Sequence, residues 1–476
     1  MTLIKDLQSL LGPDHVCTDE HVLAPMLLDN RDRFHGKACA VVMPGSTSEV
    51  SEVMKLCARH NALVFTQGGN TGNAAAATPV VSDQDAKRSI LLNLKRMNAI
   101  ESIDPVNDTA TVQAGVIVEN LQNAAAQAGR LFAVSLAAQG SCTVGGILAT
   151  NAGGVHVLHY GNSREQCLGL EVVTADGTIL NLMRGLRKDN TGYDLKDLFI
   201  GSEGTLGVIT RAVLKLHARP VCRTVLVVAC DELKDIEPLF TSLSSELGPQ
   251  MTAFELMHRD TIAMVRKMMP DVTASFSLDG NWYVLVEFSF TSTSMQAVCE
   301  ETLSAALEPL FDSGTVSDAV ISQSESQCEA LWKIRESIPS AHKHAGGNVK
   351  HDISVPRSRL TDFVLETNRR LQNTFEWIAP SVFGHFGDGN LHYNMGVRAG
   401  FDPRLCFEHE EAIHDIVYEN VVAYDGSIAA EHGIGRLKAD LLTKVKAPAE
   451  IAFMHALKNS FDPQWRLNPG AVLVRH

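Results

Sequence analysis

The sequence predicts an α+β protein of more than one domain, and three observations predict it. The chain has 476 residues, of which 45% are hydrophobic, which is long for one core and ample for two or three domains. Short apolar strands and amphipathic helices alternate along its first half. After Leu216 the alternation continues with few motifs, which indicates a separate domain built on an antiparallel sheet.

The N-terminal region predicts a strand–helix–strand unit. Residues 1–37 suggest a helix and polar loops, and residues 40–44 form the first clear strand. A helix is expected over 48–60, because its apolar side chains recur every 3.6 residues and Ser46 or Thr47 can cap it. Residues 62–67 are the next buried strand.

This second strand ends in a glycine loop, Gly68 to Gly72. Glycines let backbone N–H groups approach phosphate oxygens, which side chains would obstruct. A tight turn without a ligand is the alternative. No GxGxxG fingerprint follows the first strand, so an NAD-type domain is not supported.

Two more glycine-rich segments follow. Short strands over 90–116 and a helix over 118–128 precede residues 140–154, where small residues let the backbone pass close to a large flat ligand. We interpret this stretch as the wall of a cofactor site. A hairpin over 168–180 leads to a further cluster, Gly201 to Gly207.

The second half predicts three strands, two helices and a mixed C-terminal region. Residues 325–345 suggest a helix, residues 350–356 a strand that ends at proline, and residues 407–424 an amphipathic helix. The chain after Leu437 is mostly helical as far as Asn468. The strands cover 224–230, 281–290 and 315–322, and the helices 233–247 and 295–311.

The candidate chemistry lies in HFGDGNLH, residues 385–392, read together with Glu431 and His432. The Gly-Asp-Gly-Asn sequence between His385 and His392 is turn chemistry, so both imidazoles can aim at one point. Two histidines and one carboxylate suit a divalent metal used as a Lewis acid. A glycine-rich turn without a metal is the other reading.

Five other histidines are expected to do no chemistry. In HEEAIH, His409 and His414 are five residues apart and diverge around a helix, so we expect both to be solvated. His342, His344 and His351 are likewise expected at the surface or in loops rather than as ligands.

Composition excludes several classes of partner. Asp and Glu number 55 and Lys and Arg 41, and no basic patch stands out, which argues against nucleic acid or an anionic membrane. No run approaches the ~20 apolar residues of a membrane span, and no apolar signal core is present, so a cytoplasmic protein is expected. The cysteines indicate no disulfide framework or thiolate zinc site.

Eight motifs carry a family resemblance. They are QGGNTG (67–72), GSCTVGG (140–146), TNAGG (150–154), LRKDNTGYDLKDLFIGSEGTLGVIT (186–210), KHDISVP (350–356), HFGDGNLH (385–392), EHGIGRLK (431–438) and NPG (468–470). Together, and in this order along nearly the whole chain, they resemble the FAD-linked oxidases and dehydrogenases of the vanillyl-alcohol oxidase superfamily. The closest likeness within it is to D-2-hydroxyglutarate dehydrogenases, with D-lactate dehydrogenases next.

The resemblance implies an FAD-binding domain over 1–217, a substrate-binding α+β cap domain over 218–430 and a small helical C-terminal domain over 431–476. It implies His385, His392 and Glu431 as metal ligands and His432 as catalytic base. It also implies that Asn394 contacts the substrate carboxylate beside the metal, and that Arg335 and Lys350 anchor the distal carboxylate. The implied flavin-binding residues are Gln67, Gly68, Gly69, Asn70, Thr71, Gly72, Gly140, Ser141, Gly145, Asn151, Gly154, Glu203, Gly204, Gly207, Ile209 and Asn468.

The resemblance also implies an activity, the oxidation of D-2-hydroxyglutarate to 2-oxoglutarate, with D-lactate or another D-2-hydroxy acid as the alternative substrate. FAD is expected to be non-covalent, because Asn70 stands where some relatives carry a linking residue. The metal is expected to be zinc, with manganese, cobalt or iron as alternatives. Electron-transfer flavoprotein or quinone is the implied acceptor, and the chain is expected to form a homodimer. An oxygen-reducing oxidase and a flavin-free binding protein remain alternatives.

The sequence departs from the family pattern at three places. His159 replaces the usual arginine before Tyr-Gly, and residues 73–77 are alanine-rich where glycines are common. Pro339 stands where a threonine helps to grip the distal carboxylate. The last departure bears directly on the choice of substrate.

Overall fold

The computed structural model describes residues 2–272, 276–277 and 279–475, and the chain divides into two compact units. Unit 1 comprises Met1–Gly154, Gly161–Ala218 and Glu431–His476; unit 2 comprises Val155–Tyr160 and Arg219–Ala430. The segment 431–476, expected as a separate helical domain, is thus part of unit 1. The backbone gives the reason, because Val64 N donates to Arg466 O and Asn468 N donates to Val64 O, which joins this segment to a central strand.

A four-stranded sheet forms one half of unit 1, in the order β1-β2-β4-β3. Strands β2, β4 and β3 are parallel, and β1 is antiparallel to β2. Helix α3 (Thr47–Arg59) connects β2 to β3, and Ser46 caps it by accepting a bond from Glu49 N, as the sequence predicts. The four strands are β1 (Val16–Cys17), β2 (Ala40–Val42), β3 (Leu63–Gln67) and β4 (Ser89–Asn93).

A five-stranded antiparallel sheet forms the other half, in the order β5-β6-β10-β8-β9. Strands β8 and β9 make the predicted hairpin, in which Thr174 N donates to Thr178 O across the turn. Both halves share one apolar core, which includes Val64 of β3 and Leu214 of β10. The strands are β5 (Ile100–Asp104), β6 (Thr109–Gln113), β8 (Cys167–Val173), β9 (Ile179–Leu182) and β10 (Val208–Lys215).

Short elements complete unit 1. The helix expected over 118–128 is α5, and two helices follow residue 437 as expected. These elements are α1 (Leu3–Leu11), α2 (Glu20–Met26), α4 (Asp83–Ala86), α5 (Val118–Gln127), α6 (Val144–Ala149), α8 (Lys196–Phe199), α16 (Ala439–Val445), α17 (Pro448–Phe461), and the paired strands β7 (Arg130–Leu131) and β11 (His217–Ala218).

Unit 2 is built on a seven-stranded sheet in the order β15-β12-β14-β13-β17-β18-β16, in which every neighbouring pair is antiparallel. The sequence predicts this antiparallel sheet. Its strands are β12 (Cys222–Cys230), β13 (Met251–His258), β14 (Trp282–Phe290), β15 (Asp318–Ile321), β16 (Asp352–Ser354), β17 (Ile378–Gly384) and β18 (Asn390–Val397).

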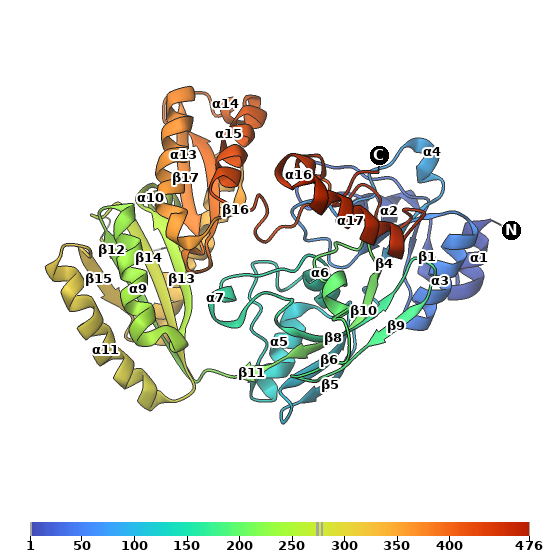
Figure 1. Cartoon of the computed structure of the whole chain (residues 1–476), viewed down its shortest axis with the longest axis horizontal. Coiled ribbons are helices and arrows are strands. Elements are labelled where there is room, and N and C mark those ends of the chain that lie inside the picture. The colour runs from blue at the N-terminus through green and yellow to red at the C-terminus, as the bar shows by residue number, and fades with distance from the viewer. Residues whose placement is uncertain (1, 273–275, 278, 476) are drawn as a thin grey trace. The chain divides into compact units, whose positions relative to one another are not determined.

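Helices cover both faces of this sheet (Figure 1). Successive side chains of a strand point to opposite faces. Phe254 of β13 packs on Phe240 of α9 at 5.0 Å between ring centroids, whereas Ala253 and Met257 share a core with residues of α10 and α12. The helices of unit 2 are α7 (Val157–Tyr160), α9 (Ile236–Leu247), α10 (Arg259–Met268), α11 (Thr293–Asp312), α12 (Glu325–His344), α13 (Leu360–Thr374), α14 (Leu405–Glu408) and α15 (Glu410–Ala423).

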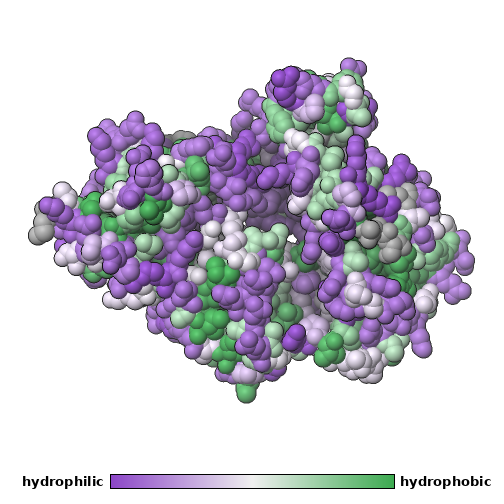
Figure 2. Space-filling model, turned by 180° about the vertical axis from the view of Figure 1, so that it is seen from behind, coloured by the Kyte–Doolittle hydropathy of each residue, from purple (hydrophilic) through white to green (hydrophobic). Residues whose placement is uncertain are grey.

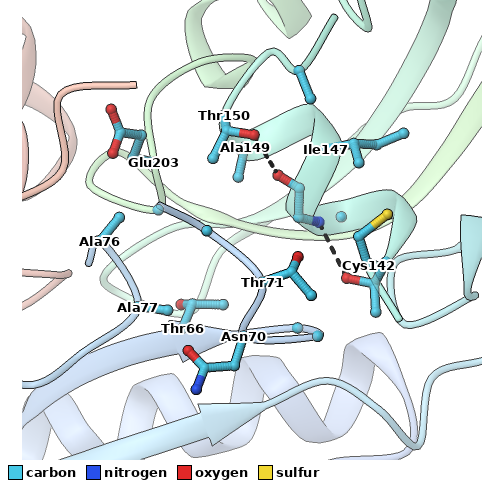
Figure 3. A pocket seen from close by; sticks show the side chains of 18 of the residues that line it. Thr66, Asn70, Thr71, Ala76, Ala77, Cys142, Ile147, Ala149, Thr150 and Glu203 are labelled. Atoms are coloured by element: carbon cyan, nitrogen blue, oxygen red, sulfur yellow. Dashed lines mark hydrogen bonds between the residues drawn. The ribbon is translucent and has the colours of Figure 1, made fainter. Parts of the chain in front are cut away.

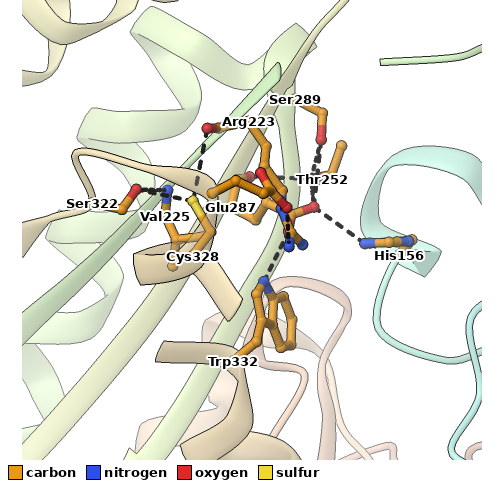
Figure 4. Close-up of polar contacts among 10 residues, drawn as sticks. His156, Arg223, Val225, Thr252, Glu287, Ser289, Ser322, Cys328 and Trp332 are labelled. Atoms are coloured by element: carbon orange, nitrogen blue, oxygen red, sulfur yellow. Dashed lines mark hydrogen bonds and ion pairs between the residues drawn. The ribbon is translucent and has the colours of Figure 1, made fainter. Parts of the chain in front are cut away.

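A buried carboxylate, Glu287 of β14, ties several parts of unit 2 together (Figure 4). It is 2% exposed and accepts bonds from Trp332 Nε1 at 2.8 Å and Arg223 Nη1 at 3.1 Å. His156 Nε2 lies 3.2 Å away, and Thr252 Oγ1 donates at 2.8 Å. Burial alone would raise the pKa of Glu287, but these donors, with His156 first among them, lower it from 4.5 to about 2.

Glu287→Gln is expected to flatten the acid limb of the stability curve. A carboxylate whose pKa is lower in the folded state stabilises the fold above pH 4.5, and this contribution is lost as the pH falls toward 2. The shift corresponds to about 3 kcal/mol. Urea unfolding at pH 7, 4.5 and 3 measures it: the variant should be less stable at pH 7 and lose less on acidification. An unchanged pH dependence would contradict this role.

Little of the surface in view is apolar. The face in Figure 2 is mostly hydrophilic, with small apolar areas between polar ones. Within the described residues, no helix is long and apolar enough to cross a membrane.

Candidate functional site

Unit 1 contains a cavity lined by residues from four parts of the chain, 66–77, 136–152, 203–209 and 431–432, together with Asp29, Leu94, Ala114 and Asn468. We call it the unit 1 cavity. Much of its wall is backbone and small side chains, which suits a large ligand. The predicted flavin-binding residues in its wall are Gly68, Gly69, Asn70, Thr71, Gly72, Gly145, Glu203, Gly204, Gly207, Ile209 and Asn468.

Close backbone approach explains the first glycines of the loop. A Cβ on Gly69 would lie 2.0 Å from Ser141 O, and one on Gly68 would lie 2.1 Å from Thr143 Oγ1. Only glycine permits this contact between the loop and the start of α6. Asn70 follows with φ +58° and donates from Nδ2 to Leu28 O at 2.8 Å, which fixes the loop from its other side.

Figure 3 shows small side chains on both walls of the unit 1 cavity. Ala76 and Ala77 belong to the alanine-rich segment that departs from the family pattern, and both line the cavity. Cys142 lines it as well, and burial raises the pKa of this thiol to about 11. Cys142 belongs to the stretch 140–154 that the sequence predicts as a cofactor wall, whereas sequence reasoning assigned Ala76 and Ala77 no role, because an alanine carries no signal of ligand contact.

Five predicted flavin-binding residues do not line the cavity: Gln67, Gly140, Ser141, Asn151 and Gly154. Gln67 donates from Nε2 to Met26 O, and Asn151 accepts from Arg164 N through Oδ1. Ser141 is the residue against which Gly69 packs. A Cβ on Gly154 would lie 1.9 Å from Ser135 O.

His432 and Glu431 lie in the wall of the cavity, at the start of the EHGIGR segment. Glu203 holds this segment in place: Ile434 N donates to its Oε1 and Gly435 N to its Oε2, both at 2.8 Å. Gly433 must be glycine, since its φ is +76° and a Cβ would lie 2.7 Å from Glu203. The side chain of Glu203 therefore positions the loop that carries His432.

Glu203 is 6% exposed, and burial raises the pKa of its carboxyl from 4.5 to about 7. The two backbone N–H donors and Lys438 act in the opposite direction and keep the shift from being larger. Lys438 is itself 6% exposed. Glu203 thus has a structural role in the wall that its predicted role in flavin binding did not include.

The predicted turn between His385 and His392 is present in unit 2. A 3-10 turn over Phe386–Asp388 and Gly389, with φ +86°, connect β17 to β18, and His392 lies on β18 opposite Phe383. The rings of His385 and His392 are 5.4 Å apart and meet edge to face. Glu431, the third predicted ligand, belongs to unit 1 and directly follows the last residue of unit 2. The complete ligand set stays a prediction.

A buried carboxylate that sequence reasoning missed lies beside His385. Glu255 of β13 is 0% exposed, and its Oε1 is 2.5 Å from His385 Nδ1. Its Oε2 accepts from Arg335 Nε at 2.6 Å. Burial alone would raise the pKa of Glu255, but His385 and Arg335 lower it to about 2. The signal was available, since Glu255 is the one charged residue before His258 in the apolar strand MTAFELMH.

The predicted substrate residues of unit 2 differ in their surroundings. Arg335 is 5% exposed and lies over the ring of Phe383, 5.0 Å from its centroid. Asn394 is 4% exposed and accepts from His351 N through Oδ1 at 3.3 Å. Lys350 is exposed. Their roles toward a substrate stay predictions.

Two of the histidines expected at the surface are buried, so that expectation is wrong for them. His342 is 4% exposed, with Nε2 2.8 Å from Ser381 Oγ, and burial and the charge of Lys350 lower its pKa to about 4. His351 is 1% exposed and bonds to His414 at 2.8 Å, so His414 is not simply solvated either. Their apolar neighbours come from strands distant in sequence, which spacing along one helix cannot reveal.

Comparison with known proteins gives two family matches. Residues 219–472 match the C-terminal domain of FAD linked oxidases, and residues 38–183 match an FAD binding domain.

Three relatives span most of the chain. A mitochondrial D-2-hydroxyglutarate dehydrogenase of Bos taurus is 37% identical over 98% of this chain and 82% of its own. A D-2-hydroxyglutarate dehydrogenase of Stutzerimonas stutzeri is 36% identical over 99% of both chains. A putative mitochondrial D-lactate dehydrogenase of Schizosaccharomyces pombe is 39% identical over 95% of this chain and 85% of its own.

A solved structure, that of p-cresol methylhydroxylase with substrate bound, resembles the whole chain in fold. Its TM-score is 0.76 at 16% identity, over 99% of this chain and 96% of that one. The predicted fold class is confirmed: unit 1 carries an FAD-binding domain of the vanillyl-alcohol oxidase type.

Proposed function

Because this chain belongs to the family of FAD-linked oxidases and is an FAD-dependent hydroxyacid dehydrogenase, we propose that it oxidises D-2-hydroxyglutarate to 2-oxoglutarate. Relatives from a mammal and a bacterium carry this activity in their names and align with nearly the whole chain. The substrate class is taken from these relatives, and the roles of single residues are those that the family motifs imply.

One observation carries the proposal: His432 lines the same cavity as the glycine loops. The residues of this cavity suit FAD, because its walls are backbone and small side chains. Its glycine loops pack so closely that a Cβ on Gly68 or Gly69 would clash with the neighbouring chain. When bound, FAD supplies the acceptor for the hydride that leaves C2 of the substrate. His432 then stands beside the flavin, as a general base must.

His432 removes the proton of the substrate hydroxyl. Its imidazole must be neutral to do so. Glu203 keeps the following loop in place by accepting from Ile434 N and Gly435 N, which restricts where the imidazole can move. A base held in position is worth more than a mobile one, because catalysis depends on orientation.

A divalent metal would be held by His385, His392 and Glu431. Two imidazoles and a carboxylate are ligands that zinc, manganese, cobalt and iron accept, with zinc as our first choice. When bound, the metal supplies Lewis-acid chemistry that makes the hydroxyl more acidic. Asn394 would donate to the C1 carboxylate through Nδ2, because Nδ2 is the donor of its amide and Oδ1 accepts from His351 N.

Arg335 and Lys350 bind the distal carboxylate. A dicarboxylate matches two cations better than a monocarboxylate, which leaves one charge without a partner. Arg335 Nε is engaged with Glu255, so its terminal nitrogens Nη1 and Nη2 are the atoms that face the substrate. D-lactate is the second candidate substrate, favoured by the relative from Schizosaccharomyces pombe.

FAD is proposed to be dissociable. Cys142 is a cysteine in the cavity wall, but a thiol whose burial raises its pKa to about 11 stays protonated at neutral pH and is a poor nucleophile. Asn70, at the loop position, has no nucleophilic atom.

We further propose electron-transfer flavoprotein as acceptor, with quinone second. A cytoplasmic location and a homodimer stay predictions, and two of the relatives are mitochondrial by name.

An anaerobic titration of the purified protein tests the proposal. Flavin absorbance is followed as D-2-hydroxyglutarate, D-lactate or D-malate is added, before and after treatment with a metal chelator. We expect D-2-hydroxyglutarate to bleach the flavin at the lowest concentration. Chelation should abolish bleaching and a divalent ion should restore it, because the hydroxyl then regains its acidity.

Three results would contradict parts of the proposal. Bleaching by D-lactate at a lower concentration would contradict a dicarboxylate as the preferred substrate. Bleaching that survives complete chelation would show that the reaction does not need a metal. If none of the acids bleaches the flavin, the proposed oxidation of 2-hydroxy acids is wrong.

A further inference from the structure

Glu255 connects two residues that the proposed function places at opposite ends of the substrate. One carboxylate oxygen lies 2.5 Å from His385 Nδ1, and the other accepts from Arg335 Nε at 2.6 Å. Strand β13 holds Glu255 near the middle of the seven-stranded sheet, where the side chain is 0% exposed. The sheet therefore fixes the carboxylate, and the carboxylate fixes both partners.

The contact with His385 decides which ring nitrogen is left for a ligand. A carboxylate accepts hydrogen bonds and donates none when it is ionised, so His385 Nδ1 carries the proton in this contact. When the imidazole is neutral, Nε2 is then the nitrogen that carries the lone pair. Histidines that bind metals in proteins almost always donate their other N–H to a carboxylate, a carbonyl or water, which sets the tautomer and the ring orientation.

The contact with Arg335 orients the guanidinium plane. Its Nε is held by Glu255, and its central carbon lies 5.0 Å from the centroid of Phe383. The ring of His392 packs on the same Phe383 at 4.9 Å between centroids. The planar guanidinium is thus held by Glu255 through Nε and by the ring of Phe383.

We propose that Glu255 is a positioning residue that orients the metal ligand His385 and the substrate anchor Arg335 together. The inference rests on the proposed function, from which it takes the roles of these two residues. Its consequence is that one side chain sets the spacing between the metal-binding end and the distal-carboxylate end of the substrate site. Loss of Glu255 should therefore weaken metal binding and substrate binding together.

A purely structural role is the competing explanation, since a buried ion pair can serve the fold alone. The chain offers a matched control for it. Glu287 lies on the neighbouring strand β14, is 2% exposed, and likewise bonds to an arginine and a histidine, Arg223 and His156. Both carboxylates share their face of the sheet with α12, from which Trp332 reaches Glu287 and Arg335 reaches Glu255. Only the partners of Glu255 have a predicted site role.

The experiment compares the purified FAD-loaded wild type with Glu255→Gln and Glu287→Gln. Zn²⁺ binding is measured by equilibrium dialysis against a competing chelator, and FAD absorbance and thermal unfolding are recorded in parallel. Both variants should unfold at lower temperature. Glu255→Gln should bind Zn²⁺ about 10 to 100 times more weakly, the usual effect of losing the partner of a ligand histidine. Glu287→Gln should bind Zn²⁺ as the wild type does.

Glu255→Asp guards against a Glu255→Gln variant that does not fold. It keeps the charge but withdraws the carboxylate by one methylene, so we expect a folded protein with weakened Zn²⁺ binding. Wild-type Zn²⁺ affinity in a folded Glu255 variant, or an equal loss in Glu287→Gln, would overturn the positioning role alone. A wild type that binds FAD but no Zn²⁺ would overturn both this role and the metal site of the proposed function.

Discussion

Replacing His432 with alanine is expected to slow flavin reduction by D-2-hydroxyglutarate by ~10²- to 10⁴-fold, the usual scale of a general base. FAD should stay bound, because the loops that form most of the unit 1 cavity do not depend on this imidazole. The proton of the substrate hydroxyl would then have to leave to water. Anaerobic stopped-flow absorbance at saturating substrate measures the reduction rate directly.

His60→Ala is the matched control for this variant. His60 is a partly buried histidine of unit 1 that bonds to Asp6 through Nε2 at 2.7 Å and does not line the cavity. Its loss should leave the reduction rate within about twofold of the wild type, as expected for a residue outside the site. If His432→Ala reduces its flavin at the wild-type rate, His432 is not the base.

The position of His432 shows what the sequence could and could not predict. Two glycines after His432 predict an irregular loop, and the loop is present. The sequence did not indicate what holds it, because Glu203 is more than two hundred residues away and its bonds go to backbone N–H groups. A contact with backbone leaves no complementary side chain in the sequence to find.

Local patterns predicted many of the elements, but β13, α10 and α13 in unit 2 were not predicted. The helix with apolar residues at 3.6-residue spacing is α3, the Ala-Asp-Gly turn closes β8 on β9, and the Gly-Asp-Gly-Asn turn closes β17 on β18. Each of these depends on neighbours within a few residues, where periodicity and turn chemistry act. The division into units was harder, since the chain leaves unit 1 after Ala218 and returns at Glu431.

Burial of polar residues was the main failure. Glu255 and His385 are 130 positions apart, and the bond between them depends on the order of strands in the sheet. His342 and His351 were expected at the surface or in loops, yet both are buried. Their partners, Ser381 and His414, come from other strands and helices. Hydrogen-bond partners of this kind follow from topology rather than from local pattern.

Lys350→Met is expected to weaken the binding of D-2-hydroxyglutarate far more than the binding of D-lactate. The charge of Lys350 reaches the buried end of α12, since it lowers the pKa of His342. A hydrogen bond to a charged group is worth about 1.5–3 kcal/mol, so the concentration of D-2-hydroxyglutarate at half bleaching should rise about 10- to 100-fold. D-lactate has no distal carboxylate to lose a partner. Anaerobic titrations of both acids, on one preparation of each variant, give the comparison.

Lys333→Met is the matched control, because Lys333 is an exposed lysine on α12 next to buried residues and has no predicted site role. It separates the loss of one positive charge on the protein from the loss of a specific contact, since long-range attraction of a dianion depends on total charge. Equal weakening of both acids by Lys350→Met would contradict the dicarboxylate pocket. If both variants weaken the binding of D-2-hydroxyglutarate equally, the effect comes from the total charge of the protein rather than from a contact with Lys350. Arg335 would then be the one anchor left to test.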